Sequence, residues 1–417
     1  MKSGFAETIR GLLDRPLASY CLLLSSSALL LTIGLVMVFS ATMVESYAQQ
    51  GSAFGVVVRQ ATWALVGLIG FWIAQRLPAR TYRSIARPLL VLSVLLGLII
   101  LLPDLGNAAV GTDDRWIHVG PVQFQPAEIA KFALLLWVAD SLARLGPRIA
   151  SWRDLAIPLF PIAGLVMLII GYPDLGTMLI IVAMFIGLLW SAGVPLRILG
   201  LLFTVALAGS TLLVAFEGYR MERLLSFSRP QDFADSWGYQ AIQGYYAIAD
   251  GGWFGVGLGE SRQKWEWLPS GHNDFIFALI AEELGVVGCL VILALFGVLA
   301  YTGFRIAWRS ADPFRKLVSA GVTIWLVSQM FINIGGVLGL IPITGVPLPF
   351  ISDGGTALVV VLVAVGMLAG FARAEPDAAT ALRARNPSRL VRFLWAPLPP
   401  APAGPSPQPT GSTASPD

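Results

Sequence analysis

The chain has 417 residues, of which 56% are hydrophobic and 13% are charged, with a formal net charge of +3 and a mean hydropathy of +0.73. Soluble globular domains of this length are far less apolar, so the composition excludes that class and predicts an all-α polytopic membrane protein. The two cysteines lie in apolar runs, which argues against a disulfide or thiolate metal framework, and the modest positive charge does not indicate nucleic acid as a partner.

A membrane span needs about 20 apolar residues. We expect ten spans, at 19–43, 57–75, 88–103, 126–143, 155–172, 175–191, 197–216, 284–304, 317–341 and 355–372. The chain then divides into an N-terminal segment at 1–18, a ten-span membrane domain at 19–374 and a tail at 375–417. The tail is rich in Pro, Ser and Ala, with little to bury, and is expected to be disordered.

The basic residues indicate how these spans are oriented. Most of the 28 lysines and arginines fall on the same side as the N-terminus. Because basic residues are retained on the cytoplasmic side, both termini are predicted to be cytoplasmic. The long segment between the seventh and eighth spans, 217–283, is then extracytoplasmic, and it is the part of the sequence large enough to hold a substrate.

The first outer loop carries Arg115 and Trp116 and leads into the fourth span, which contains Glu128 and Lys131. The three-residue spacing places these opposite charges on one helix face. An ionisable pair inside a span is costly unless it is partnered or faces a polar cavity, which favours a functional role. The alternative is a structural ion pair that locks two helices together. Trp116 is either an interfacial anchor or a residue that faces a lipid or a sugar.

The outer segment ends in a glycine-rich run, 251–259, followed by Asp274 and an apolar stretch at 275–281. The glycines do not belong to a βαβ unit, so a nucleotide-binding loop is rejected. The apolar stretch predicts a short interfacial helix with Asp274 near its start. Helix position favours the ionised carboxylate and burial opposes it, a balance suited to a general base. The alternatives are an N-cap without chemistry and His272 as a rival base.

The last outer loop, 341–356, contains three prolines in eight residues and is nonetheless apolar. It cannot form a regular helix, and unpaired backbone cannot face lipid. We therefore expect this loop to fold back against protein or to line a cavity.

These stretches, in this order, resemble the motifs of the SEDS family (shape, elongation, division and sporulation proteins), which are ten-span membrane glycosyltransferases. The matching stretches are RWI at 115–117, QPAE at 125–128 with Lys131, PDLGT at 173–177, GWFGVGLG at 252–259, HNDFIFA at 272–278, EELG at 282–285 and TGVPLP at 344–349. The residues at 261–265 and the proline-rich tail resemble the division branch more than the elongation branch. The chain departs from the family at Asp353, where relatives usually carry an uncharged residue.

The resemblance implies a peptidoglycan glycosyltransferase that polymerises lipid II in the cytoplasmic membrane at the division site. It implies that Asp274 is the catalytic aspartate, and that Trp116, Glu128 and Lys131 line a central cavity. Arg115 and His272 are added as candidate substrate-binding residues. The implied partners are membrane lipid, a single-span class B penicillin-binding protein and other division proteins.

In the expected reaction, Asp274 takes the proton from the 4-hydroxyl of the incoming sugar, and Lys131 or loop arginines stabilise the departing pyrophosphate. No His, Cys or Asp cluster has metal-ligand spacing, so no cofactor is evident; whether a divalent cation assists is left open. Two other functions compete. One is a lipid II flippase, in which Glu128 and Lys131 line a headgroup path. The other is a scaffold whose catalysis a partner supplies.

Overall fold

The computed structural model describes residues 11, 13–101, 116–119, 122–146, 149, 152–216, 218–265, 267–384 and 395. Within these ranges ten long helices occupy the predicted spans. They are α2 (Ala18–Gln50), α3 (Gly55–Ala74), α4 (Ala79–Leu101), α6 (Pro126–Leu145), α7 (Trp152–Gly171), α8 (Leu175–Ala192), α9 (Leu196–Ala215), α12 (Ile276–Arg309), α13 (Pro313–Val337) and α14 (Gly355–Arg373).

Eight of these helices are long and apolar enough to cross a membrane. The other two are α6, which carries several charged residues, and α9, in which the apolar stretch Leu196–Leu212 is shorter than a full span. The prediction of an all-α polytopic membrane protein is confirmed.

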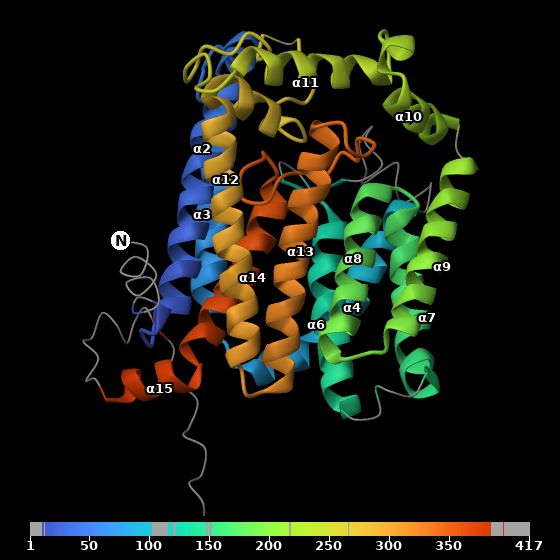
Figure 1. Cartoon of the computed structure of the whole chain (residues 1–417), viewed down its shortest axis with the longest axis vertical. Coiled ribbons are helices and arrows are strands. Elements are labelled where there is room, and N and C mark those ends of the chain that lie inside the picture. The colour runs from blue at the N-terminus through green and yellow to red at the C-terminus, as the bar shows by residue number, and fades with distance from the viewer. Residues whose placement is uncertain are drawn as a thin grey trace, which may run out of the picture.

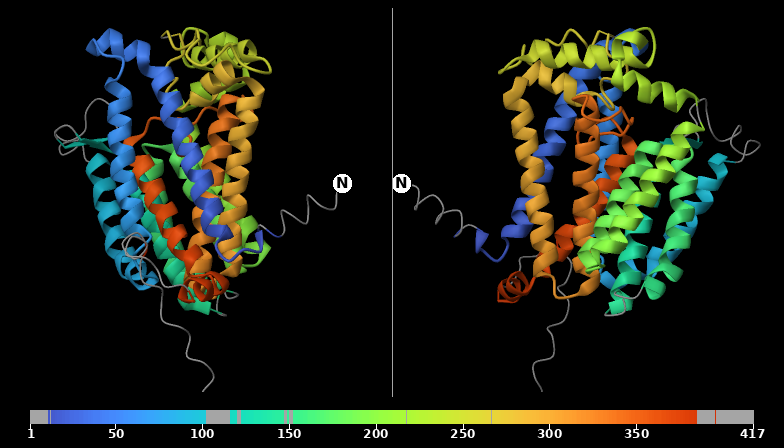
Figure 2. Two further views of the ribbon diagram at one scale, coloured as in Figure 1. Left: turned by 90° about the vertical axis from the view of Figure 1, so that its left-hand side faces the viewer. Right: turned by 45° about the vertical axis from the view of Figure 1, so that its right-hand side comes forward.

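Smaller elements close the two ends of the helical bundle. At one end lie the helices α10 (Gly218–Ser228) and α11 (Trp237–Gly251), joined by the 3-10 helix η2 (Pro230–Phe233); α11 lies across the bundle there (Figure 1). The strands β1 (Ile117–Val119) and β2 (Val122–Phe124) form an antiparallel hairpin. Helix α15 (Pro376–Arg383) lies at the opposite end, and Figure 2 shows the same arrangement from two further directions. We call the end covered by α11 the outer end.

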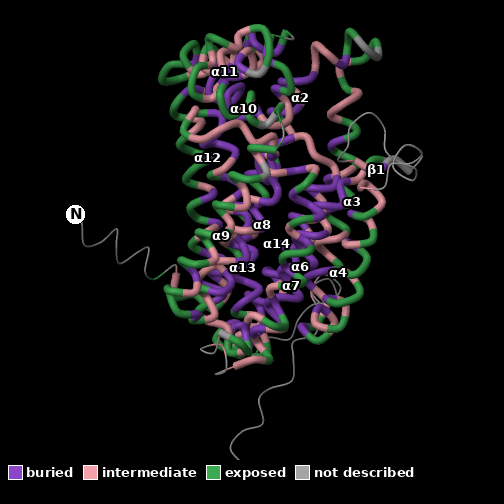
Figure 3. Tube along the Cα trace, turned by 90° about the vertical axis from the view of Figure 1, so that its right-hand side faces the viewer, coloured by how far each residue is buried: buried purple, intermediate pink, exposed green. Residues whose placement is uncertain are grey.

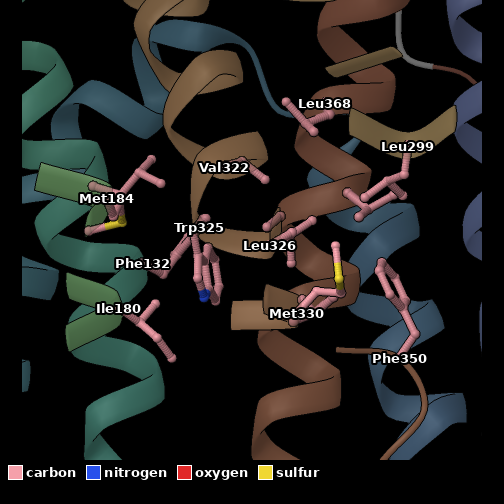
Figure 4. Packing of buried hydrophobic residues seen from close by; sticks show 14 of the residues in the cluster. Phe132, Ile180, Met184, Leu299, Val322, Trp325, Leu326, Met330, Phe350 and Leu368 are labelled. Carbon is pink, nitrogen blue, oxygen red and sulfur yellow. The ribbon is translucent and has the colours of Figure 1, made fainter. Parts of the chain in front are cut away.

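The centre of the bundle is formed by α13 and α14, most of whose residues are buried, whereas α3 and α4 present exposed faces to the surroundings. Buried residues therefore run through the middle of the molecule and exposed ones around it (Figure 3). In the core, Trp325 and Leu326 of α13 pack among side chains of the neighbouring helices (Figure 4). This apolar packing fixes α13 against α6, α8 and α12.

Helix α12 is broken near its outer end at Gly285, where φ is +66°. The part before the break corresponds to the short helix expected after Asp274, and the part after it to the eighth span. At the break, the backbone of the glycine-rich run pairs with α12: Val256 N donates to Glu282 O at 2.9 Å, and Val286 N donates to Gly252 O at 3.0 Å.

The glycines of this run allow that close approach between the two backbones. A Cβ on Gly255 would lie 2.1 Å from Glu283 O, and one on Gly285 would lie 2.4 Å from Gly255 N. No side chain fits at such distances. The run therefore serves backbone packing, which agrees with the rejection of a nucleotide-binding loop.

Two buried glutamates fasten the same loop to the bundle. Glu282 accepts hydrogen bonds from Ser261 Oγ at 2.5 Å and from Arg262 N at 2.8 Å, while Glu283 accepts one from Ser40 Oγ of α2 at 2.7 Å. Lys264 Nζ lies 4.0 Å from Glu283 Oε1. Because buried carboxylates are stable only with such partners, these contacts fix the loop over the ends of α2 and α12.

The segment expected to be a disordered tail from residue 375 begins with folded structure. Glu375 is buried, with its carboxylate 3.1 Å from Arg309 Nε, and α15 follows it directly. Trp395 Nε1 donates to the Tyr20 hydroxyl of α2 at 3.0 Å. The folded part therefore includes α15, and residues 385–394 and 396–417 of the expected tail lie outside the described residues.

Candidate functional site

Asp274 lies at the outer end of the bundle, just before α12 begins, and is partly buried. The N-cap of α12 is Phe275, so Asp274 lies one residue before the position that the capping alternative required. A small pocket beside Asp274 is lined by Asn333 and Gly336 of α13 and by residues 343–346 of the proline-rich loop. This pocket joins the predicted base to two segments that are distant in the sequence.

The main chain around Asp274 is held by three successive hydrogen bonds. The carbonyl oxygen of His272 accepts from Asp353 N at 3.1 Å. The next carbonyl oxygen, of Asn273, accepts from Ser352 Oγ at 2.6 Å, and that of Asp274 accepts from Asn333 Nδ2 at 2.7 Å. The residues before α12 thus take their position from α13 and from the proline-rich loop.

Two amides of α13 hold the proline-rich loop. Asn333 Nδ2 donates to Val346 O at 2.7 Å, and Gln329 Nε2 donates to Pro347 O at 2.8 Å. They are four residues apart on one helix face, about 6 Å along the axis. The loop residues Val346 and Leu348 are buried. The expectation that this loop folds back against protein is therefore confirmed, because side chains satisfy its free carbonyls.

Glu128 and Lys131 form an ion pair inside the bundle, with Nζ 2.8 Å from Glu128 Oε1. Lys131 Nζ also donates to Gln329 Oε1 at 3.1 Å, and the same oxygen accepts from Trp325 Nε1 at 2.8 Å. The two charged side chains are 1% and 0% exposed. The ion pair lies within α6, and Lys131 joins it to α13 through the hydrogen bond to Gln329. This arrangement favours a structural role, and Lys131 does not reach an open surface.

A chain of polar contacts therefore runs from the buried ion pair to the site. It passes from Lys131 to Gln329, on to the carbonyls of Pro347 and Val346, and through Asn333 to Asp274. Glu128 Oε2 is buried without a hydrogen-bond partner among the described residues. The predicted base and the buried ion pair are thus linked through hydrogen bonds and the backbone of the proline-rich loop.

The remaining predicted residues lie around this site or beyond what is described. The His272 side chain is partly exposed, with Nδ1 3.7 Å from Glu45 Oε2 of α2. Trp116 is partly buried and directly precedes β1, whereas Arg115 lies outside the described residues. Asp353, where the chain departs from the family pattern, is paired with Arg59 of α3 at 3.0 Å.

Sequence reasoning missed Gln329, Asn333 and Ser352 as parts of this site. A signal for the first two exists, since they are amides at i and i+4 inside an otherwise apolar span. Ser352 carries no comparable signal, because serine is common in loops. Among the residues that the structure describes, no three His, Cys, Asp or Glu side chains come together in a group able to hold a metal ion.

The chain matches known proteins over most of its length. Residues 20–376 match the family model FTSW_RODA_SPOVE, described as "Cell cycle protein". The chain is 44% identical to "Probable peptidoglycan glycosyltransferase FtsW" of Mycobacterium tuberculosis, over 93% of this chain and 74% of that protein. It is 38% identical to "Stage V sporulation protein E" of Bacillus subtilis, over 84% and 96% of the two chains.

Two solved structures share the fold. One is described as "Structural coordination of polymerization and crosslinking by a peptidoglycan synthase complex" and has a TM-score of 0.69 at 28% identity, covering 85% of this chain and 97% of that one. The other is the rod shape determining protein RodA of Thermus thermophilus, with a TM-score of 0.62 at 27% identity, covering 85% and 96%.

Proposed function

We propose that this chain, which belongs to the FtsW, RodA and SpoVE family of cell cycle proteins, polymerises lipid II into glycan strands at the outer face of the cytoplasmic membrane. It is a multi-pass membrane protein and an enzyme of peptidoglycan glycosyl transfer. Identity of 44% with an FtsW, against 27% with a RodA, supports a role at the division site. Both termini are proposed to be cytoplasmic.

In the proposed reaction, the 4-hydroxyl of the incoming lipid II sugar attacks C1 of the sugar at the lipid-linked end of the growing strand. The new C–O bond forms as the bond from C1 to the pyrophosphate breaks, with inversion at C1. Undecaprenyl pyrophosphate leaves with the electron pair of that bond. The proton of the attacking hydroxyl passes to the carboxylate of Asp274, which acts as general base.

The observation that carries this assignment is the setting of Asp274. It is a partly buried carboxylate residue beside a pocket, at the outer end of the bundle. A general base has to reach the hydroxyl that it deprotonates while being held in place. A lipid-linked sugar at the outer membrane surface meets this end of the protein first.

The leaving pyrophosphate needs positive charge nearby. Lys131 is fully buried in this structure, so we assign this role to arginines at the outer end. Arg59 and Arg262 have exposed side chains there, and Arg115 precedes β1. Glu128 and Lys131 then maintain the helix arrangement on which the site depends. No step is assigned to a divalent cation.

The proposed partner is a class B penicillin-binding protein, acting with other division proteins. The similar structure described as a peptidoglycan synthase complex couples polymerization to crosslinking. A strand made by this chain needs crosslinking to enter the wall, and the partner would supply that activity.

Purified protein in detergent, given lipid II, tests the proposal. The wild-type chain should form glycan polymer, and Asp274→Asn should lose at least about 10²-fold in rate while remaining folded, because the amide cannot accept the proton. Polymerisation by Asp274→Asn at the wild-type rate would overturn the assignment of the base. A flippase would form no polymer in detergent, and a scaffold would form polymer only with its partner.

A further inference from the structure

We infer that Asn333 and Ser352 are positioning residues that hold Asp274 in its working place. This inference rests on the proposed role of Asp274 as general base. Neither residue is assigned a contact with substrate. Each is placed to act through the main chain of the segment that carries the base.

The segment before α12 has little conformational support of its own. Residues 271–275 form turns and belong to no helix or strand. Their position therefore depends on bonds to other parts of the molecule. Three consecutive carbonyls, at 272, 273 and 274, accept those bonds from Asp353 N, Ser352 Oγ and Asn333 Nδ2.

Asn333 uses both hydrogens of its amide nitrogen. One bond goes to Asp274 O and the other to Val346 O, each at 2.7 Å, and the residue is buried. The side chain thus joins α13, the proline-rich loop and the base at a single atom. An aspartate of the same shape has no donor when ionised and would place a negative charge against two carbonyl oxygens.

Ser352 completes the attachment from the other side. Its hydroxyl donates to Asn273 O at 2.6 Å and accepts from Leu348 N at 2.7 Å. One small buried hydroxyl therefore ties the peptide next to Asp274 to the loop that Asn333 also holds. Threonine keeps this hydroxyl and alanine removes it.

The position of a base matters most in the transition state. Misplacement of a reacting group by about 1 Å costs about 10²-fold in rate. Because the two side chains bond to the main chain of the protein, their loss should lower turnover with little change in the lipid II concentration that gives half the maximal rate. A defect in substrate binding or in general folding would not show this separation.

The test measures polymerisation of lipid II in detergent over a range of concentrations, for Asn333→Ala, Asn333→Asp, Ser352→Ala and Ser352→Thr. Ser93→Ala is the matched control. Ser93 is buried in α4, and its hydroxyl donates to Leu90 O of the same helix at 2.8 Å. Thermal unfolding and elution as a single species confirm that each variant is folded.

Turnover should fall about 10- to 100-fold for both Asn333 variants and for Ser352→Ala, with half-saturation little changed. Ser352→Thr should restore most of the turnover, and Ser93→Ala should retain it. Folded variants with full turnover, or a defect confined to half-saturation, would overturn the inference. Asp274→Asn is measured alongside. If that variant is active, the proposed base itself is wrong; if it is inactive while the Asn333 and Ser352 variants are fully active, the positioning role alone fails.

Discussion

The buried ion pair of α6 gives the most specific prediction on stability. Glu128 Oε1 and Lys131 Nζ are 2.8 Å apart, and neither side chain is more than 1% exposed. Removing one partner leaves the other charge buried, which costs about 3–5 kcal/mol, whereas replacing both by neutral groups of similar size is often close to neutral. Glu128→Gln and Lys131→Met should each destabilise the folded chain strongly, and the double variant should recover most of the loss.

Denaturant unfolding in detergent, analysed as a double-mutant cycle, measures this coupling. The matched control is the pair Arg229 and Asp232, which has the same three-residue spacing but lies 4.0 Å apart with side chains 81% and 62% exposed. Solvent screens that pair, so its coupling should be about 0–1 kcal/mol. If the Glu128 and Lys131 costs simply add in the double variant, the two charges do not depend on each other and the reasoning is refuted.

Three further predictions concern the glycine-rich run, the end of the bundle opposite α11, and Asp353 beside the site. Gly285→Ala should destabilise the folded chain by more than about 1 kcal/mol, because φ is positive there and a backbone atom lies 2.4 Å from the new Cβ. The control Gly297→Ala, in the same helix, places its Cβ in open space, so equal melting temperatures of the two variants would contradict this prediction. Burial raises the pKa of Glu375 above its ordinary value of 4.5, so the folded chain binds this proton more tightly than the unfolded chain does. The free energy of unfolding of the wild type, relative to that of Glu375→Gln, should therefore fall as pH rises from 4.5 through the raised pKa. If the two melting temperatures differ by the same amount at every pH, folding does not shift the pKa of this carboxyl. Asp353→Asn should change thermal stability by about 1 kcal/mol or less, because its partner Arg59 is mostly exposed, and a larger loss would mean that the pair is not screened.

The span pattern and the location of Asp274 were predictable from the sequence. An apolar run of about 20 residues is a local property, and the lipid environment converts it into a helix because the backbone has to satisfy its own hydrogen bonds. The described helices accordingly overlap all ten predicted ranges, with ends that differ by up to nine residues, and eight of them are long and apolar enough to cross a membrane. The distribution of Lys and Arg predicts that Asp274 faces the extracytoplasmic side, and in the structure it lies at the end covered by α11.

The partners of Asp274 were not predictable in this way. Asn333 is 59 residues from Asp274, and Ser352 is 79 residues from Asn273, so neither contact has a local signal. The burial of Lys131 likewise depends on the packing of α13 against α6. The sequence alone determined which segments form long apolar helices and which connecting segment carries the carboxylate, because hydrophobicity acts residue by residue along the chain. Only the tertiary structure decided which side chains hold that carboxylate, because hydrogen bonds between distant segments form only where packing brings donor and acceptor within about 3 Å.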